Sequence, residues 1–285
     1  MQKLLKAGLR LLSAVAPGAA AKIGARLWFG VRRPRISEET ARFLATGVRF
    51  DVRVDEINVV AWQWGSGPTV LLVHGWGGYA GQLEAFVQPL VQGGHEVIAF
   101  DAPSHGASGP GKLGQGRATL FDFSSAMVAV SRERALAGVI AHSGGCAAAA
   151  WALTTNTKWC PQRMVFFAPF GSAARYMDAF QRALGLSDEA MRRFRADTER
   201  QFNFRWADFE VPAITDRVST PPVLVVHDRG DRETSWEDGA AIAARWPEAR
   251  LVTTTGLGHN RILRDAGMVE AAVEFIGARG RTPLE

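Results

Sequence analysis

The sequence predicts a doubly wound α/β domain with a mostly parallel sheet, and three observations lead to that prediction. Continuous apolar runs of strand length recur along the 285-residue chain, as expected for parallel strands that are buried on both faces. Helical stretches separate these runs, so β and α elements alternate. The length suits one large domain that carries an insertion.

The regular alternation begins near residue 46, where the periodicity of the sequence changes. Two strands near a sheet edge are expected at 46–54 and 57–65, with Gly-Ser-Gly as the turn after the second. Five buried strands and one further strand follow, at 69–75, 95–101, 135–143, 163–169, 221–228 and 249–256. Helices are predicted between and after them, at 81–92, 119–133, 145–155, 239–246 and 266–278.

Residues 171–211 interrupt this alternation, because they are helical throughout where a direct crossover needs one short helix. Tyr176 and Phe180 belong to one apolar stripe, and Ser187 has the character of an N-cap for a second helix. An insertion at this point lies over the carboxyl ends of the strands, where open α/β sheets bind ligands. We therefore expect a small helical cap after the sixth strand, with Tyr176, Phe180 and Trp206 in contact with substrate. The core then comprises 38–170 and 212–285.

Residues 1–37 form a basic N-terminal arm. Eight of the 33 basic residues precede the first acid, Glu38, which leaves 25 bases against 28 acids in the remainder. The body is thus mildly acidic, which argues against nucleic acid as a partner. Lys6 and Arg10 interrupt the apolar stretch that a secretory signal would need, and their spacing predicts an amphipathic helix. Two alternatives stay open: the helix packs on the body, or it lies on an anionic membrane surface.

Cysteine usage and apolar runs bear on the compartment and on cofactors. Cys146 and Cys160 show neither a disulfide framework nor zinc spacing. The expectation is a cytoplasmic protein, with membrane association through the arm as the alternative. Residues 109–114 formally match a dinucleotide-binding glycine pattern, but Pro110 intrudes and no strand directly precedes them. No cofactor and no metal are predicted.

The stretch from His142 to Gly145 places a serine at a strand-to-helix corner. Ser143 has Ala141 two positions before it and Gly145 two positions after it. A sharp strand-to-helix turn is strained, and small neighbours at these two positions avoid clashes. The turn exposes Oγ near a helix N-terminus, where main-chain N–H groups can meet a developing oxyanion. The pattern favours a nucleophile over a simple helix cap.

A serine nucleophile needs a base and an orienting acid, and later loops offer both. The loop after the strand at 221–228 contains Asp228 and Asp231. A glycine-rich loop after the last strand contains His259. The glycine-rich turn after the strand at 69–75 could direct the Trp76 N–H toward the same point.

Five motifs in this order resemble the α/β-hydrolase superfamily, serine esterase/lipase-type branch, over residues 45–280. They are HGWGG, DAPSHGASG, AHSGG, HDRGD and GLGHN. The resemblance implies an α/β-hydrolase fold with Ser143 as nucleophile, Asp231 as acid and His259 as base. It also implies an oxyanion hole made by the N–H groups of Trp76 and Gly144. The family usually has glycine where this chain has Ala141, which is small enough for the same turn.

The function expected from this resemblance is hydrolysis of carboxylic esters with short to medium acyl chains through an acyl-enzyme. His142 is an additional candidate for substrate contact, although motif histidines more often shape turns. Thioesterase, lipase, aminopeptidase and carbon–carbon bond hydrolase reactions stay open, as does a ligand-binding member of the fold without turnover. The expected partner is a small-molecule ester, and the sequence assigns no oligomeric state.

Overall fold

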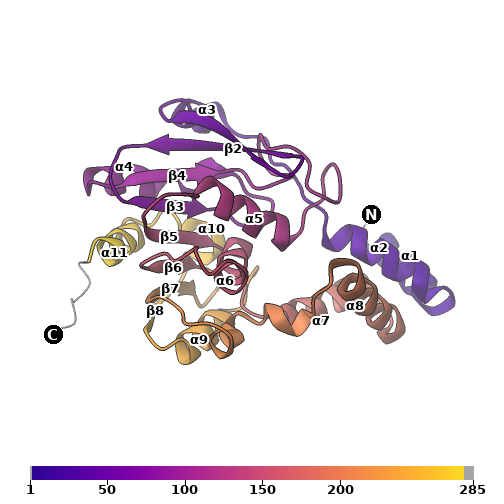
Figure 1. Cartoon of the computed structure of the whole chain (residues 1–285). Helices are drawn as coiled ribbons and strands as arrows, with labels where there is room; N and C mark the ends of the chain where they lie inside the picture. The colour runs from indigo at the N-terminus through magenta and orange to yellow at the C-terminus, as the bar shows by residue number, and fades with distance from the viewer. Residues whose placement is uncertain (1, 279–285) are drawn as a thin grey trace.

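The computed structural model describes residues 2–278, with side chains from residue 6 onward, and contains an eight-stranded sheet (Figure 1). The strands are β1 Val48–Val54, β2 Ile57–Trp64, β3 Thr69–Val73, β4 Glu96–Phe100, β5 Leu136–His142, β6 Met164–Phe167, β7 Val223–Asp228 and β8 Ala249–Thr254. Their order in the sheet is β1-β2-β4-β3-β5-β6-β7-β8. Only the pairings of β2 with β1 and β4 are antiparallel, and all others are parallel.

The two faces of the sheet carry separate apolar cores. Helices α5 (Leu120–Val130), α6 (Gly144–Thr155) and α9 (Trp236–Arg245) contribute side chains to one core. Helices α4 (Glu84–Gln92) and α11 (Ala266–Gly277) contribute to the other. Every residue of the central strands β3 to β7 is buried, whereas β1 and β8 at the edges are partly exposed. Because both faces are covered, the central strands have continuous apolar sequences instead of alternating ones.

The predicted cap is present and consists of α7 (Ala173–Leu184) and α8 (Asp188–Phe202), followed by the short 3-10 helices η2 (Trp206–Phe209) and η3 (Val211–Asp216). Ser187 caps α8 by accepting the Ala190 N–H at 3.2 Å. Figure 1 shows α7 and α8 at one end of the molecule, beside the N-terminal helices. The cap therefore lies on the side of the sheet to which the parallel strands lead.

The N-terminal arm is a pair of helices, α1 (Gln2–Val15) and α2 (Pro17–Trp28), that packs against the cap (Figure 1). Ala20 and Ala21 of α2 share an apolar cluster with Met191 and Phe194 of α8. Ser13 Oγ accepts the Ser187 N–H at 2.6 Å, which links α1 to the start of α8. The expectation that the arm packs on the body needs refinement, because its helices lie on the cap. No helix in the described part of the chain combines the length and apolar character that crossing a bilayer requires.

The segment after α2 ties the arm to the core. The Val31 N–H donates to the Gly116 carbonyl at 2.8 Å. Arg33 donates from Nε to the Ser104 carbonyl at 2.8 Å and from Nη2 to the Ser108 carbonyl at 2.7 Å. The arm thus has defined contacts with both the cap and a loop of the core.

The α/β-hydrolase fold predicted from the sequence is confirmed, and the predicted strands all form. The structure adds α3 (Glu38–Leu44), η1 (Ala80–Leu83) and α10 (Gly258–Arg261). It also divides the arm into two helices at Ala16, whose backbone is not helical, and Pro17 begins the second. Proline suits the first turn of a helix because it has no N–H to leave unpaired.

Candidate active site

Ser143 forms a strained corner between β5 and α6. Its backbone has φ 52° and ψ −121°, a conformation that a residue with a side chain rarely adopts. Gly145 is required beside it, because a Cβ there would lie 2.5 Å from the His74 carbonyl oxygen. A Cβ on Gly75 would likewise lie 3.0 Å from the Ser143 Cβ. The small residues that the sequence places around Ser143 thus permit this turn and its close approach to the preceding loop.

Two main-chain N–H groups lie close to Ser143. A Cβ on Gly144 would lie 3.6 Å from the Trp76 nitrogen, so the two peptide groups are neighbours. Neither N–H donates a hydrogen bond to another group within residues 2–278. The Trp76 indole Nε1 donates to the Gly30 carbonyl at 2.9 Å, which fixes the orientation of this turn. The arrangement can accept a negatively charged oxygen beside Ser143.

His259 and Asp231 are paired. His259 Nδ1 donates to Asp231 Oδ2 at 2.8 Å, and the Asp231 side chain has no exposed surface. Thr234 Oγ1 donates to the same carboxylate oxygen at 2.9 Å, and His227 Nε2 lies 3.4 Å from it. The Glu233 N–H donates to Oδ1 at 2.8 Å. The carboxylate is therefore held in one orientation by groups on every side.

These contacts decide the ionisation of Asp231. Burial by itself raises the pKa of the carboxyl group, because it removes water from the charged form. The side chains of His227 and His259 outweigh this effect, and the pKa of Asp231 lies well below its usual value. Asp231 is thus a carboxylate at neutral pH and can stabilise a proton on His259.

Asp228 has a different environment. Its Oδ2 accepts the Thr254 hydroxyl at 2.8 Å and the Leu257 N–H at 2.9 Å, and its Oδ1 accepts the Gly230 N–H at 2.8 Å. Burial raises the pKa of Asp228, but these hydrogen bonds more than offset it, so the pKa is lowered overall. The side chain holds together the loops after β7 and β8 and does not contact His259.

Ser143 and His259 form no hydrogen bond with each other in this structure. The His259 Nε2 lies 3.9 Å from the Glu233 carboxylate, and Glu233 also accepts the Asn260 side-chain amide at 3.1 Å. Hydrogen bonds between nucleophile and base are often long or absent before substrate binds.

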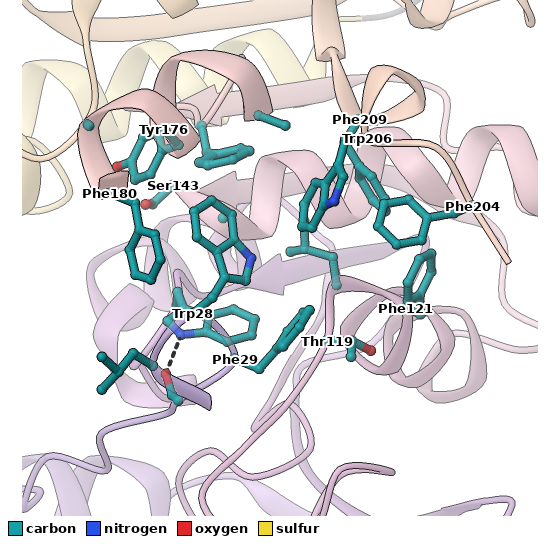
Figure 2. Close-up of a pocket in the computed structure, with 18 of the residues that line it drawn as sticks. Trp28, Phe29, Thr119, Phe121, Ser143, Tyr176, Phe180, Phe204, Trp206 and Phe209 are labelled. Atoms are coloured by element: carbon teal, nitrogen blue, oxygen red, sulfur yellow. Dashed lines mark hydrogen bonds between the residues drawn. The ribbon is translucent and has the colours of Figure 1, made fainter. Parts of the chain in front are cut away.

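Ser143 and Gly144 line a cavity of about 510 Å³. Its wall is formed by the end of α2, the cap and the start of α5, and no charged side chain lines it. Figure 2 shows Ser143 near Tyr176 and Phe180, with Phe121 and Phe204 at the other end of the view. The aromatic residues of the wall are Trp28, Phe29, Trp76, Phe121, Phe170, Tyr176, Phe180, Phe204, Trp206 and Phe209. A cavity of this size and character suits an apolar group of a small molecule.

Comparison with known proteins identifies the family of the chain. The profile of the Alpha/beta hydrolase family matches residues 70–272. The chain belongs to this family. The matched region includes Ser143, Asp231 and His259, but it begins after the arm and therefore omits the part of the cavity wall that α2 supplies.

Solved structures of other family members are similar in fold but distant in sequence. A serine hydrolase involved in carbazole degradation is 17% identical, with a TM-score of 0.60 over 82% of this chain and 100% of the other. A membrane phospholipase A described as a bacterial virulence factor is 18% identical, with a TM-score of 0.61 over 97% and 98%. Est1E from Butyrivibrio proteoclasticus with ferulic acid bound is 19% identical, with a TM-score of 0.59 over 80% and 96%. No match is found among curated proteins.

The four residues that the sequence predicts to contact substrate fall into two groups: three line the cavity, and one does not. Tyr176, Phe180 and Trp206, which the sequence predicts to contact substrate, line the cavity together with Ser143. His142 does not line it: the ring is buried and Nε2 donates to the His259 carbonyl at 3.0 Å. Burial lowers the pKa of His142 to about 3, so the side chain is neutral. The hydrogen bond ties the end of β5 to the loop that carries His259.

Several residues around the site were missed from the sequence. The cavity wall includes Trp28 and Phe29 of the arm, and the Asp231 carboxylate contacts His227 and Thr234. The run Leu27-Trp-Phe at the end of an amphipathic segment was an available signal for the first pair. Within residues 6–278, no three His, Cys, Asp or Glu side chains gather in a way that could hold a metal ion.

Proposed function

We propose that the chain is a serine hydrolase that cleaves carboxylic esters through Ser143, His259 and Asp231. The observation that carries the proposal is the position of Ser143, whose strained corner opens onto an apolar cavity beside two free N–H groups. The buried Asp231–His259 pair completes a set of nucleophile, base and acid. Membership of the Alpha/beta hydrolase family supports the same chemistry.

In the proposed mechanism His259 accepts the proton of Ser143 as Oγ attacks the ester carbonyl carbon. Asp231 keeps the His259 proton on Nδ1, so that Nε2 is free to act as base, and it stabilises the imidazolium that forms. His259 then transfers its proton to the departing alcohol, and an acyl-enzyme remains on Ser143. Water releases the acid in a second step, with His259 again as base.

The N–H groups of Trp76 and Gly144 would bind the oxyanion of each tetrahedral intermediate. A donor of this kind is worth about 3 kcal/mol of barrier where it has been removed in other enzymes. The Trp76 N–H depends on its side chain for position, because the indole hydrogen bond to Gly30 anchors the turn. The arm therefore supports the oxyanion site as well as the cavity wall.

The cavity indicates the class of substrate. Its uncharged, largely aromatic wall favours an apolar acyl or alcohol group, and a charged one would lose hydration without gaining a partner. The volume of about 510 Å³ supports a short to medium chain. The cap and α2 bound this space on the side away from the sheet.

The test is labelling of the full chain with a fluorophosphonate, followed by a panel of p-nitrophenyl esters graded in acyl length. Wild-type protein should be labelled, and Ser143→Ala should lose labelling and at least nine-tenths of ester turnover. A Ser143→Ala protein that keeps more activity than this would remove Ser143 as nucleophile. Thioesters and emulsified long-chain triglycerides belong in the panel, because faster turnover of either would replace the esterase assignment. A folded, unlabelled and inactive wild type would indicate a ligand-binding member of the fold.

A further inference from the structure

The two arm helices expose large apolar side chains. Leu11 is 67% exposed and Val15 is 73% exposed, and they lie on the same side of α1 because they are four residues apart. Ile23 (38%) and Leu27 (44%) share one side of α2 in the same way. These four are among six exposed large hydrophobic residues in the described chain, although α1 and α2 together span only Gln2 to Trp28. We call this surface the arm face.

The arm face is placed differently on the two helices relative to the cap. Leu9 and Ser13 are the buried residues of α1, and Ser13 bonds to the start of α8. On α2 the inward residues include Ala20 and Gly24, where a Cβ on Gly24 would meet Leu186 at 3.4 Å. On α1 the exposed pair Leu11 and Val15 therefore lies on the side opposite the cap. On α2, Ile23 and Leu27 follow Ala20 and Gly24 by three positions, so they border the packed side of that helix.

Basic residues accompany the apolar ones. Lys6, Arg10, Lys22 and Arg26 are all exposed, and α1 and α2 contain no acidic residue. None of the four forms an ion pair within the described part of the chain. Lys6 and Arg10 lie against the cap, where a Cβ on Gly185 would be 3.6 and 3.4 Å from their side chains, so these bases flank the exposed Leu11 and Val15 instead of sharing their side. A helix with exposed apolar side chains and flanking bases that reach toward headgroups suits the interface of an anionic bilayer.

A second hollow flanks α2 on its basic side. It has a volume of about 300 Å³ and is lined by Lys22, Arg26 and Arg117, with Asp197 as its one acid. Three bases against one acid give it a positive potential, which favours a phosphate group over a cationic or neutral one. The bases of α2 therefore border a recess between α2 and α8, on another side of the helix from Ile23 and Leu27.

The mouth of the main cavity adjoins the arm face. Leu27 belongs to both, since it is 44% exposed and also lines the cavity. Across the opening, Ala179 and Ala183 of α7 are exposed and line the cavity too. A surface that covers the arm face therefore also lies against the entrance that leads to Ser143.

From these contacts we infer that the arm face docks on an anionic phospholipid surface, with the cavity mouth turned toward the bilayer. The apolar side chains enter the boundary between headgroups and acyl chains, and the four bases contact the phosphates. Apolar substrates then enter between Leu27 and α7 without crossing water. Docking itself does not depend on the proposed hydrolysis.

The test is sedimentation of the full chain with phosphatidylcholine vesicles, with and without phosphatidylglycerol. Wild-type protein should partition about tenfold or more in favour of the anionic vesicles at low salt, and less so at high salt. The double variant Leu11→Asp/Val15→Asp and the double variant Lys6→Gln/Arg10→Gln should each reduce binding by about tenfold or more. Val48→Asp is the matched control, because Val48 is 71% exposed on β1; its binding should equal that of wild type.

The outcomes separate docking from catalysis. Ser143→Ala should bind vesicles as wild type does, and the arm variants should hydrolyse a water-soluble ester at the wild-type rate, which also shows that they are folded. Equal partitioning onto both kinds of vesicle would overturn the proposal, as would arm variants that bind normally. So would a wild type that ignores vesicles and forms a dimer that Leu11→Asp/Val15→Asp dissociates, because the arm face would then be an interface between copies of the chain.

Discussion

Replacing Asp231 with asparagine should invert the hydrogen bond that orients His259. Oδ1 of Asp231 accepts the N–H groups of Glu233 and Thr234 at 2.8 and 3.1 Å, so the amide oxygen of asparagine takes that position. The NH₂ group then faces His259 Nδ1, where the carboxylate accepted at 2.8 Å. An NH₂ group can only donate, and the imidazole must therefore accept at Nδ1 and carry its proton on Nε2. In that tautomer it cannot take the proton of Ser143.

The expected decrease in kcat for Asp231→Asn is roughly 10²–10⁴-fold, the range for a triad whose base has the wrong tautomer. The fold should survive, because the two main-chain contacts of Oδ1 are retained. The measurement is kcat for p-nitrophenyl butyrate together with the thermal midpoint of unfolding. A kcat within about threefold of wild type would show that His259 does not rely on Asp231, and would refute the reasoning.

Asp228→Asn is the matched control, since it makes the same chemical change three residues earlier. Its amide oxygen can keep the Thr254 and Leu257 donors, which leaves the Gly230 N–H opposite an NH₂ group. Loss of one such hydrogen bond costs about 1 kcal/mol of unfolding free energy, or about 2–4 °C in Tm. We expect kcat to stay near the wild-type value. If the kinetic loss instead falls on Asp228 and spares Asp231, the acid of the triad has been assigned to the wrong residue.

Three further outcomes are expected. Cys160 is exposed, whereas burial raises the pKa of the Cys146 thiol well above its usual value. A thiol reagent should therefore modify one cysteine in native protein and two in denaturant. Modification of both cysteines in native protein would contradict the burial of Cys146. Burial lowers the pKa of His105 to about 3, so between pH 6.5 and that value the unfolded chain binds a proton that the folded chain does not. The free energy of unfolding should therefore decrease as the pH is lowered through this window, by about 2 kcal/mol at pH 5 for one such histidine. The measurement is the urea midpoint as a function of pH, and His105→Phe should make this profile flatter. A profile that His105→Phe leaves unchanged would show that His105 is protonated in the fold. Gly145→Ala should lower the free energy of unfolding by about 1–3 kcal/mol, because its Cβ would lie 2.5 Å from a main-chain carbonyl oxygen. Gly8→Ala is the control and should not be destabilised, because nothing lies within 4 Å of its Cβ. Equal Tm values for the two variants would count against the close contact at Gly145.

The sheet could be predicted from the sequence because its signals are local. The central strands are nearly continuous apolar runs, and stretches of helical length and composition separate them. The strand-to-helix corner at Ser143 followed from the small residues on either side of it. Strand ends that meet at one edge brought Asp228, Asp231 and His259 to the same region, and the choice of Asp231 as acid came from the family resemblance.

The arm and the cavity wall could not be predicted in the same way. The contact of Ser13 with Ser187 joins residues 174 positions apart, and nothing in either segment specifies the other. The aromatic residues of α2 and of the cap come into contact only when α2 and the cap are both folded. An example is the ring contact of Trp28 with Trp206, whose centroids lie 5.5 Å apart. His142 does not line the cavity for a related reason, since its ring is buried against the His259 carbonyl, which comes from a loop 117 residues later in the chain.

The origin of the cavity wall has a consequence for how this protein diverges from its relatives. Residues 27–30 lie before residue 70, where the match to the family begins, yet they form one side of the space in front of Ser143. Substrate preference can thus change through a short stretch of sequence that carries none of the catalytic motifs. Two proteins with the same family motifs could differ in the ligands they accept by exchanging only the segment that contains residues 27–30. For the same reason, an N-terminal truncation made to simplify expression would open the cavity and alter selectivity while leaving every motif of the family in place.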